Sequence, residues 1–428
     1  MMAAPLAPAA PTHLLRTHSS PIHALSISPD NERLYSGDAS GLVVVTSTRS
    51  LRPITSWNPH TDALLGIEEW RERIITHARD NKLHVWTRVE ELPPSARLGG
   101  GSAAQMSTPR PKLRYSMDVN ALNYCRFSLL PLPAAADEDD AQAEALIALP
   151  NLVDSTSADI WALPSRERVH AAVGQTGVKM PFNVDPMERS KTGIIMSLHL
   201  YAVPRERDAV LSSSSSVSAG TRELRLLCGY ESGGVTLRRF ARTDRVTSLE
   251  GAGWEVIWDA KLHAESIMAM RVSRKNDFAL SVSADHIVVR YDLADPNVAA
   301  ACVTHRTKHP GNAALAIRDD GRVCAVAGWD GSVRLYAART MKHLGTLKYH
   351  KSACQAVEFA HALRVEKVEA GIRGSDFKAG AADEEQEEDE ESEDEMSWEE
   401  KEERARWLVA GGKDSRVSIW SLISFEKE

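Results

Sequence analysis

The chain has 428 residues, of which 43% are hydrophobic and 26% charged, and its formal net charge is −8. Eleven acidic side chains lie in one tract, DEEQEEDEESEDE at 383–395, and without them the chain sums to +3. This near-neutral remainder argues against a surface that coats nucleic acid. Five widely spaced cysteines without a C-x-x-C pair argue against a disulfide framework and a cysteine zinc site.

The N-terminal stretch MMAAPLAPAAPTHLL has no basic region and no continuous apolar run, which argues against a signal peptide. No stretch approaches the roughly 18 apolar residues that a membrane helix needs. We therefore expect a soluble intracellular protein whose Ala/Pro-rich residues 1–11 are disordered.

Beyond residue 11 the chain repeats one unit. Each unit has a histidine, a short turn, an alternating apolar strand, a second strand ending at an aspartate turn, and a third strand ending in an aromatic residue. The turn residue is Asp38, Asp80, Asp285, Asp330 and Asp414 in the five clear copies, with Ser155 and Tyr230 in its place in two weaker copies. His18, His60, His263 and His309 precede their aspartates by 20 to 22 residues.

Seven such units predict an all-β, seven-bladed propeller over residues 12–423, followed by a tail at 424–428. Steps of 42 and 45 residues between successive turns match the roughly 40–45 residues of a four-stranded blade. Longer steps contain segments that we interpret as loop insertions, at 91–112 and 204–222, and as an acidic disordered insertion, at 361–406. Residues 12–17, THLLRT, are expected to supply the outer strand of the last blade and close the ring.

The stretch ITHARDNKLHVW at 75–86 places histidines and an aspartate close together, as a catalytic or metal site would. Active sites occur once, whereas this pattern recurs around the chain, so we interpret it as structural. Only one copy has a complete set of histidine, hydroxyl, aspartate and tryptophan, and these residues, His60, Thr76, Asp80 and Trp86, are predicted to form one hydrogen-bonded network.

Other motifs do not indicate catalysis. AGGKDS at 410–415 lacks the spacing of a phosphate-binding loop, and GDASG and GYESG lack the G-x-S-x-G spacing of a nucleophile elbow. We expect no enzyme activity, no catalytic residue, no metal, no cofactor and no small-molecule substrate.

Protein partners are the expected ligands. Arg79, Trp329 and Lys413 precede turn aspartates, where propellers present loop side chains, and tryptophan and arginine are frequent interface anchors. The acidic tract is either a solubilising loop or a docking segment for a basic partner. Ser392, three residues before Glu395, resembles a site for an acidophilic kinase.

The repeats resemble WD-repeat propellers, most clearly in RDNKLHVW, GWDGSVRLY and KDSRVSIW. From about residue 12 to 423, and most distinctively at 307–360, the chain resembles the fungal ASTRA-associated protein 1 family. The resemblance implies a non-enzymatic nuclear scaffold subunit of an assembly linked to chromatin remodelling. It also implies as partners RuvB-like ATPases, a phosphatidylinositol-3-kinase-related protein and co-chaperones of that kinase class.

Two other functions are open. A WD-repeat subunit that recognises peptides, such as a ubiquitin-ligase substrate receptor, would need several arginines converging on one face. Direct binding to nucleic acid is disfavoured by the near-neutral body and the acidic tract.

Overall fold

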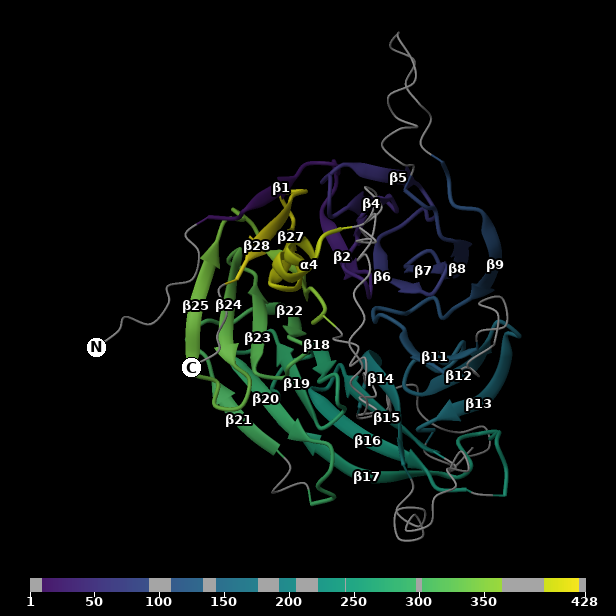
Figure 1. Ribbon diagram of the computed structural model, residues 1–428. Coiled ribbons are helices and arrows are strands. Elements are labelled where there is room, and N and C mark those ends of the chain that lie inside the picture. The colour runs from purple at the N-terminus through teal and green to yellow at the C-terminus, as the bar shows by residue number, and fades with distance from the viewer. Residues whose placement is uncertain are drawn as a thin grey trace, which may run out of the picture.

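The computed structural model describes residues 10–91, 109–133, 144–175, 192–204, 222–242, 244–297, 302–363 and 396–422. The strands form seven four-stranded antiparallel sheets arranged in a ring (Figure 1). The predicted all-β, seven-bladed propeller is therefore confirmed. We number the blades along the chain and the strands of each blade from the centre of the ring outward.

The first four blades follow one another along the chain, each as a meander of four strands. Blade 1 contains β2 (Ile22–Ile27), β3 (Arg33–Asp38), β4 (Val43–Ser47) and β5 (Pro53–Trp57). Blade 2 contains β6 (Leu64–Trp70), β7 (Arg73–Ala78), β8 (Lys82–Thr87) and β9 (Leu113–Asp118). Blade 3 contains β10 (Ser128–Pro131), β11 (Ala145–Pro150), β12 (Ala158–Leu163) and β13 (Glu167–Val173). Blade 4 contains β14 (Ile195–Pro204), β15 (Arg222–Tyr230), β16 (Gly234–Phe240) and β17 (Trp254–Lys261).

The last three blades complete the ring. Blade 5 contains β18 (Ile267–Val272), β19 (Phe278–Ser283), β20 (Ile287–Asp292) and β21 (Cys302–Arg306). Blade 6 contains β22 (Asn312–Ile317), β23 (Val323–Gly328), β24 (Ser332–Ala337) and β25 (His343–Lys348). Blade 7 contains β26 (Cys354–Phe359), β27 (Trp407–Gly412) and β28 (Val417–Ser421), and its fourth strand is β1 (His13–Leu15).

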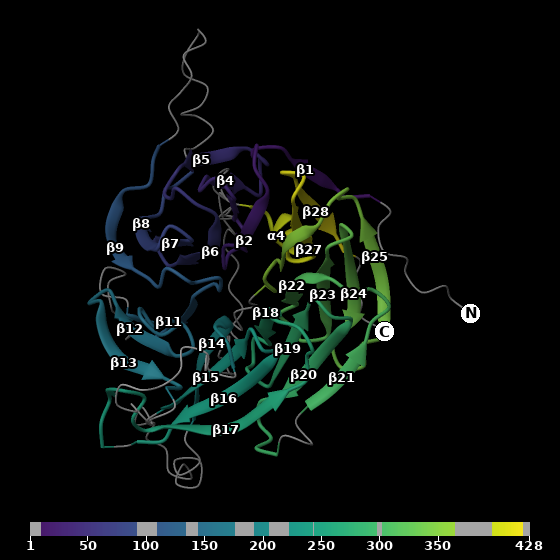
Figure 2. The same ribbon diagram turned by 180° about the vertical axis from the view of Figure 1, so that it is seen from behind.

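The N-terminal strand β1 closes the ring. It pairs antiparallel with β28, with His13 opposite Ile419 and Leu15 opposite Val417. Figure 2 shows the same pairing from behind, with β1 beside β28 at the junction of the first and last blades. Because the two ends of the chain share one sheet, backbone hydrogen bonds join the first blade to the last.

The apolar core consists of seven clusters, and each lies between two neighbouring blades. The second strand of a blade is packed on both faces, so β3, β7, β19, β23 and β27 are buried along their whole length. Outer strands such as β21 and β25 are partly exposed. Blade-to-blade packing of this kind explains why the second strands read as nearly continuous runs of apolar and small residues.

The segment 361–406 differs from its predicted disorder at its C-terminal end. Residues 398–405 form the helix α4 (Trp398–Ala405), which begins with a capping box between Ser397 and Glu400. Met396 and Arg404 are buried, and the Arg404 guanidinium lies 5.1 Å from the Trp407 ring centroid. The sequence-based prediction missed this short capped helix because the whole segment 361–406 was interpreted from its acidic composition. The acidic tract itself and Ser392 lie outside the described residues, as do 92–108 and 205–221 of the other two insertions.

Candidate functional site

Blade 2 holds the histidine network in full. The Asp80 carboxylate lies 3.0 Å from His60 Nδ1, and His60 Nε2 lies 2.9 Å from the Thr76 hydroxyl. Trp86 Nε1–H donates to the same hydroxyl over 3.0 Å. Burial lowers the pKa of His60 despite the opposing effect of Asp80, so the ring is neutral at pH 7. A neutral ring with Nδ1–H toward Asp80 and Nε2 accepting from Thr76 satisfies every polar group in the network.

Blade 7 contains a second complete set, so the prediction that blade 2 has the only one is wrong, and blade 5 contains the same set with a tyrosine in place of the tryptophan. In blade 5, His263 contacts Asp285 and Ser281, and the Tyr291 hydroxyl replaces the tryptophan at 3.0 Å from Ser281. In blade 7, His350 contacts Asp414 and Ser418, and Trp420 donates to Ser418 over 3.0 Å.

The hydroxyl of blade 7 comes from a different strand. Thr76 and Ser281 lie on the second strand of their blades, whereas Ser418 lies on the third, directly opposite Ala410. Ala410 and Thr76 both lie four residues before the turn aspartate. Because directly opposite residues in an antiparallel pair project to the same face, the hydroxyl can move across the ladder and still reach the imidazole. Matching by position along the chain therefore misses the set in blade 7.

Blade 1 has a shortened version of the network. His18 Nδ1 lies 2.9 Å from Asp38, and Nε2 lies 2.7 Å from the Ser36 hydroxyl. Asp38 is the last residue of β3, and the turn place of Asp80 is taken in blade 1 by Ser40, which donates to Asp38. The predicted turn aspartate of blade 1 is thus a strand residue, displaced by two positions so that its side chain stays on the same face.

Blade 6 does not form the network, although His309 and Asp330 have the expected spacing. Asp330 instead pairs with Arg334, and His309 is exposed with no side-chain hydrogen bond to any described residue. The two positions that could supply a hydroxyl hold Val326 and Arg334, which lie opposite each other. Without that hydroxyl, a buried imidazole would leave Nε2 unsatisfied, and the histidine stays outside.

The two weaker copies use other polar contacts at the turn. In blade 3 the Ser155 hydroxyl lies 3.3 Å from the Asn120 side chain, and Asn151 donates to Asp159 over 2.8 Å. In blade 4 the Arg238 guanidinium donates to the Tyr230 hydroxyl over 2.9 Å. Neither arrangement resembles a catalytic dyad.

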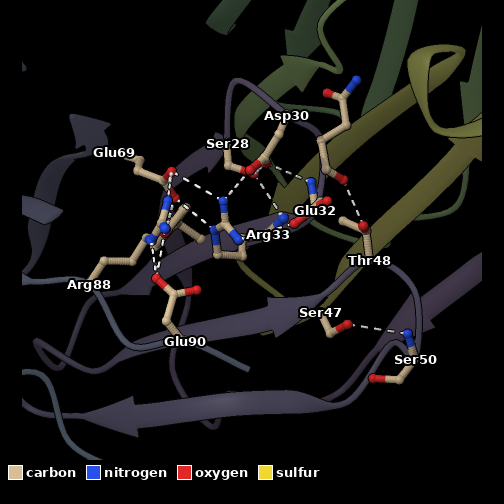
Figure 3. A network of polar contacts seen from close by, with 12 residues as sticks. Ser28, Asp30, Glu32, Arg33, Ser47, Thr48, Ser50, Glu69, Arg88 and Glu90 are labelled. Atoms are coloured by element: carbon tan, nitrogen blue, oxygen red, sulfur yellow. Dashed lines mark hydrogen bonds and ion pairs between the residues drawn. The ribbon is translucent and has the colours of Figure 1, made fainter. Parts of the chain in front are cut away.

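A buried network of charges joins blades 1 and 2 (Figure 3). The Glu69 carboxylate accepts from Arg33 Nε over 2.9 Å and from Arg88 over 3.2 Å, and it also accepts from the Tyr35 hydroxyl. Burial alone would lower the pKa of Arg33, but the hydrogen bond and charge of Glu69 raise it above its ordinary value. Asp30 and Glu32 also pair with Arg33, and Glu90 pairs with Arg88, so each guanidinium has carboxylate partners, as is typical of a structural network.

Arg79, Trp329 and Lys413 occupy the same place in blades 2, 6 and 7. Each backbone N–H donates to the residue just before the first strand of its blade, over 3.0, 2.7 and 2.9 Å respectively. This bond fixes all three at the face of the ring that carries the turns between second and third strands, which we call the turn face.

The three side chains gather around the mouth of the central channel on the turn face. Trp329 is 50% exposed and lines a cavity of about 280 Å³ together with His23 and Tyr124. The Arg79 guanidinium lies 4.8 Å from the Tyr124 ring centroid. Burial lowers the pKa of His23, and the charges of Lys413 and Arg79 lower it further, against the opposing effect of Asp38 and Asp62. Sequence spacing predicted the common face but not this convergence.

Deeper in the channel two ion pairs face the cavity. Arg126 pairs with Glu68 over 2.8 Å, and Arg271 pairs with Glu358 over 3.1 Å. Arg126 and Arg271 line both the turn-face cavity and a second one of about 530 Å³ toward the other end of the channel. Their pairing to carboxylates argues against a free anion site inside the channel.

Among the described residues, no group of three or more His, Cys, Asp or Glu side chains could hold a metal ion. No helix within the same residues is both long and apolar enough to cross a membrane.

Comparison with known proteins agrees with this architecture. The model of the WD domain, G-beta repeat, matches residues 9–46 and 301–337. The β-propeller domain of Cps50 (Swd1) from Myceliophteria thermophila superposes with a TM-score of 0.58 and 13% identity, covering 97% of this chain and 100% of that one. At this identity the superposition supports the fold alone.

Curated relatives extend over nearly the whole chain. ASTRA-associated protein 1 of Verticillium alfalfae is 33% identical, covering 96% of this chain and 92% of the relative. The protein of the same name from Penicillium rubens is 30% identical, covering 97% of this chain and 98% of the relative. The mouse guanine nucleotide-binding protein subunit beta-like protein 1 is 23% identical over 97% of each chain. This chain therefore belongs to the ASTRA-associated protein 1 family of WD-repeat proteins.

Proposed function

We propose that this protein is a non-catalytic scaffold subunit of the nuclear ASTRA complex and takes part in chromatin remodelling. The names of its relatives support an association with that complex. The histidines, aspartates and hydroxyls that could suggest catalysis in blades 1, 2, 5 and 7 are committed to one another inside the blades.

The observation that carries the proposal is the convergence of Arg79, Trp329 and Lys413 at the turn-face mouth. A half-exposed tryptophan on the rim of a cavity, on the same face as two exposed cations, has the composition of an interface centre. Tyr124, 46% exposed beneath Arg79, adds a second aromatic surface. This mouth suits a partner loop that presents acidic side chains beside an apolar one.

The partners proposed for this surface are other protein subunits. They are RuvB-like ATPases, a phosphatidylinositol-3-kinase-related protein and the co-chaperones of that kinase class. The proposed location is the nucleus.

Affinity co-purification of the tagged full-length protein from its own cells, followed by mass spectrometry, tests the proposal. We expect RuvB-like ATPases and kinase-class co-chaperones with the unaltered protein, and their loss with the triple variant Arg79→Glu, Trp329→Ala, Lys413→Glu. The matched control Arg52→Glu, Lys275→Glu changes exposed cations elsewhere and should retain the partners. Recovery of ubiquitin-ligase subunits instead would favour a substrate receptor and contradict the scaffold proposal.

A further inference from the structure

A second concave site lies between blades 5 and 6, away from the channel mouth. It is a groove of about 420 Å³ with walls from β21 of blade 5 and from β24 and β25 of blade 6. Six of its ten lining residues are basic or carry an imidazole, namely His305, Arg306, Lys308, His309, Arg334 and His343, and none is acidic. The lining of the groove therefore has basic groups without acidic ones, whereas in the channel the arginines are paired with glutamates.

Not all of these cations are available to a ligand. Asp330 pairs with Arg334, and burial together with the nearby Arg290 guanidinium lowers the pKa of His305, which keeps that ring neutral at pH 7. Arg306 and Lys308 are exposed, and neither has a carboxylate partner among the residues that the structure describes. These two side chains therefore carry the uncompensated positive charge of the groove.

The groove lies beside the blade whose repeat histidine does not form the buried network. In blades 1, 2, 5 and 7 the repeat histidine is buried in its network, whereas in blade 6 His309 is exposed and lines the groove. The core cluster between blades 5 and 6 is also the smallest of the seven, with nine buried residues. The exposed His309 therefore contributes to the groove and not to the core between the blades.

We propose that this groove binds the phosphate group of a phosphorylated serine or threonine side chain on a partner polypeptide. A phosphate monoester carries nearly two negative charges at pH 7 and accepts charge-assisted hydrogen bonds, which the guanidinium of Arg306 and the ammonium of Lys308 donate. The exposed imidazole of His309, on the loop after β21, supplies a further N–H donor, and His343 Nε2 on β25 lies 2.9 Å from the Thr346 hydroxyl.

The geometry favours a peptide as the carrier of this phosphate. β21 is the outermost strand of its sheet, so one row of its backbone N–H and C=O groups has no partner strand in the blade. An extended segment can pair with such an edge while a phosphorylated side chain enters the groove. The site does not depend on which assembly the protein joins.

Phosphorus NMR and calorimetry with the full-length protein test the proposal. The probes are a short alanine-rich peptide with one phosphoserine, its unphosphorylated twin, inorganic phosphate and inositol hexakisphosphate. We expect the phosphopeptide to bind at least about tenfold more tightly than its twin, since two charge-assisted contacts are lost without the phosphate. Arg306→Ala, Lys308→Ala should weaken its binding by a similar factor, and Arg52→Ala, Lys275→Ala should not.

A second variant, Thr346→Glu, places a negative charge in the groove without removing either cation and should also weaken binding. Circular dichroism melting establishes that each variant is folded. Unchanged phosphopeptide affinity in the folded Arg306→Ala, Lys308→Ala variant would overturn the proposal, as would equal affinity for the two peptides or no binding of the phosphopeptide. Binding of inositol hexakisphosphate alone would instead assign the groove to a free polyphosphate.

Discussion

Blades 2 and 6 start from the same residues and reach opposite arrangements. Each has a histidine about twenty residues before a turn aspartate and an aromatic residue six positions after it. In blade 2 these side chains form a buried network, whereas in blade 6 the aspartate pairs with Arg334 and the histidine is exposed. The difference comes from one hydroxyl, present at Thr76 and absent at Val326 and Arg334. In blade 2 the Thr76 hydroxyl satisfies Nε2 of the repeat histidine, the nitrogen that the aspartate does not contact, and blade 6 has no such group.

The largest expected effect is the dependence of the free energy of unfolding on acid pH, which comes from a buried histidine of blade 2. Complete burial, with a smaller contribution from His60, lowers the pKa of His77 in blade 2 to about 3, although Asp80 opposes the shift. The unfolded histidine titrates near 6.5, so between pH 6.5 and about 3 the unfolded chain binds a proton that the folded chain does not. The free energy of unfolding therefore falls as the pH falls, by about 2 kcal/mol for this residue at pH 5.

Urea unfolding at a series of pH values measures this dependence. His77→Asn should reduce it without abolishing it, because burial also lowers the pKa of His170 and His199 to about 4, and the exposed substitution Lys275→Asn should leave it as it is. A His77→Asn protein with the same loss of stability in acid would show that His77 titrates normally in the folded chain.

The next effect is the loss of the turn aspartate. Asp80→Ala should lower the free energy of unfolding by about 1–3 kcal/mol, because His60 Nδ1–H and the Lys82 backbone N–H lose their acceptor. His309→Ala, at the exposed histidine of blade 6, should change it by less than about 0.5 kcal/mol. Chemical denaturation compares the two. Equal effects, or an unchanged melting temperature for Asp80→Ala, would contradict the structural interpretation.

A smaller effect on the free energy of unfolding is expected when a tyrosine hydroxyl is removed from a blade with the network and from blade 6, which lacks it. Tyr291→Phe in blade 5 removes the hydroxyl that bonds Ser281 and should cost about 0.5–1.5 kcal/mol. Tyr336→Phe in blade 6 should be close to neutral, since its hydroxyl has no hydrogen-bond partner among the described residues. A cost for Tyr336→Phe as large as that for Tyr291→Phe would point to a network in blade 6.

The smallest effect is expected outside all of the blades. Deletion of 383–395 should leave the melting temperature unchanged, because a tract with eleven acidic residues cannot bury apolar surface. The deletion keeps Met396 and the capped helix α4. A lower melting temperature would mean that the tract stabilises the ring.

The sequence by itself determined the number of blades, the alternation of strands and turns, and the positions of the turn-face residues. These features are local: a two-residue period defines a strand, and Asp, Asn, Gly or Ser next to it defines a turn. The histidine network of blade 2 was also readable, because all four members occur at their expected spacing.

Only the tertiary structure decided what depends on neighbours across the sheet or between blades. Register placed the Ser418 hydroxyl opposite Ala410 and completed the network of blade 7, and in blade 6 it placed Val326 opposite Arg334. Closure of the ring brought His23, Tyr124 and Trp329 together around one cavity. Packing between blades 5 and 6 placed residues of β21, such as His305, and residues of β25, such as Thr346, around one groove. Spacing along a chain fixes which residues share a strand, but distances between strands and blades follow from pairing and packing.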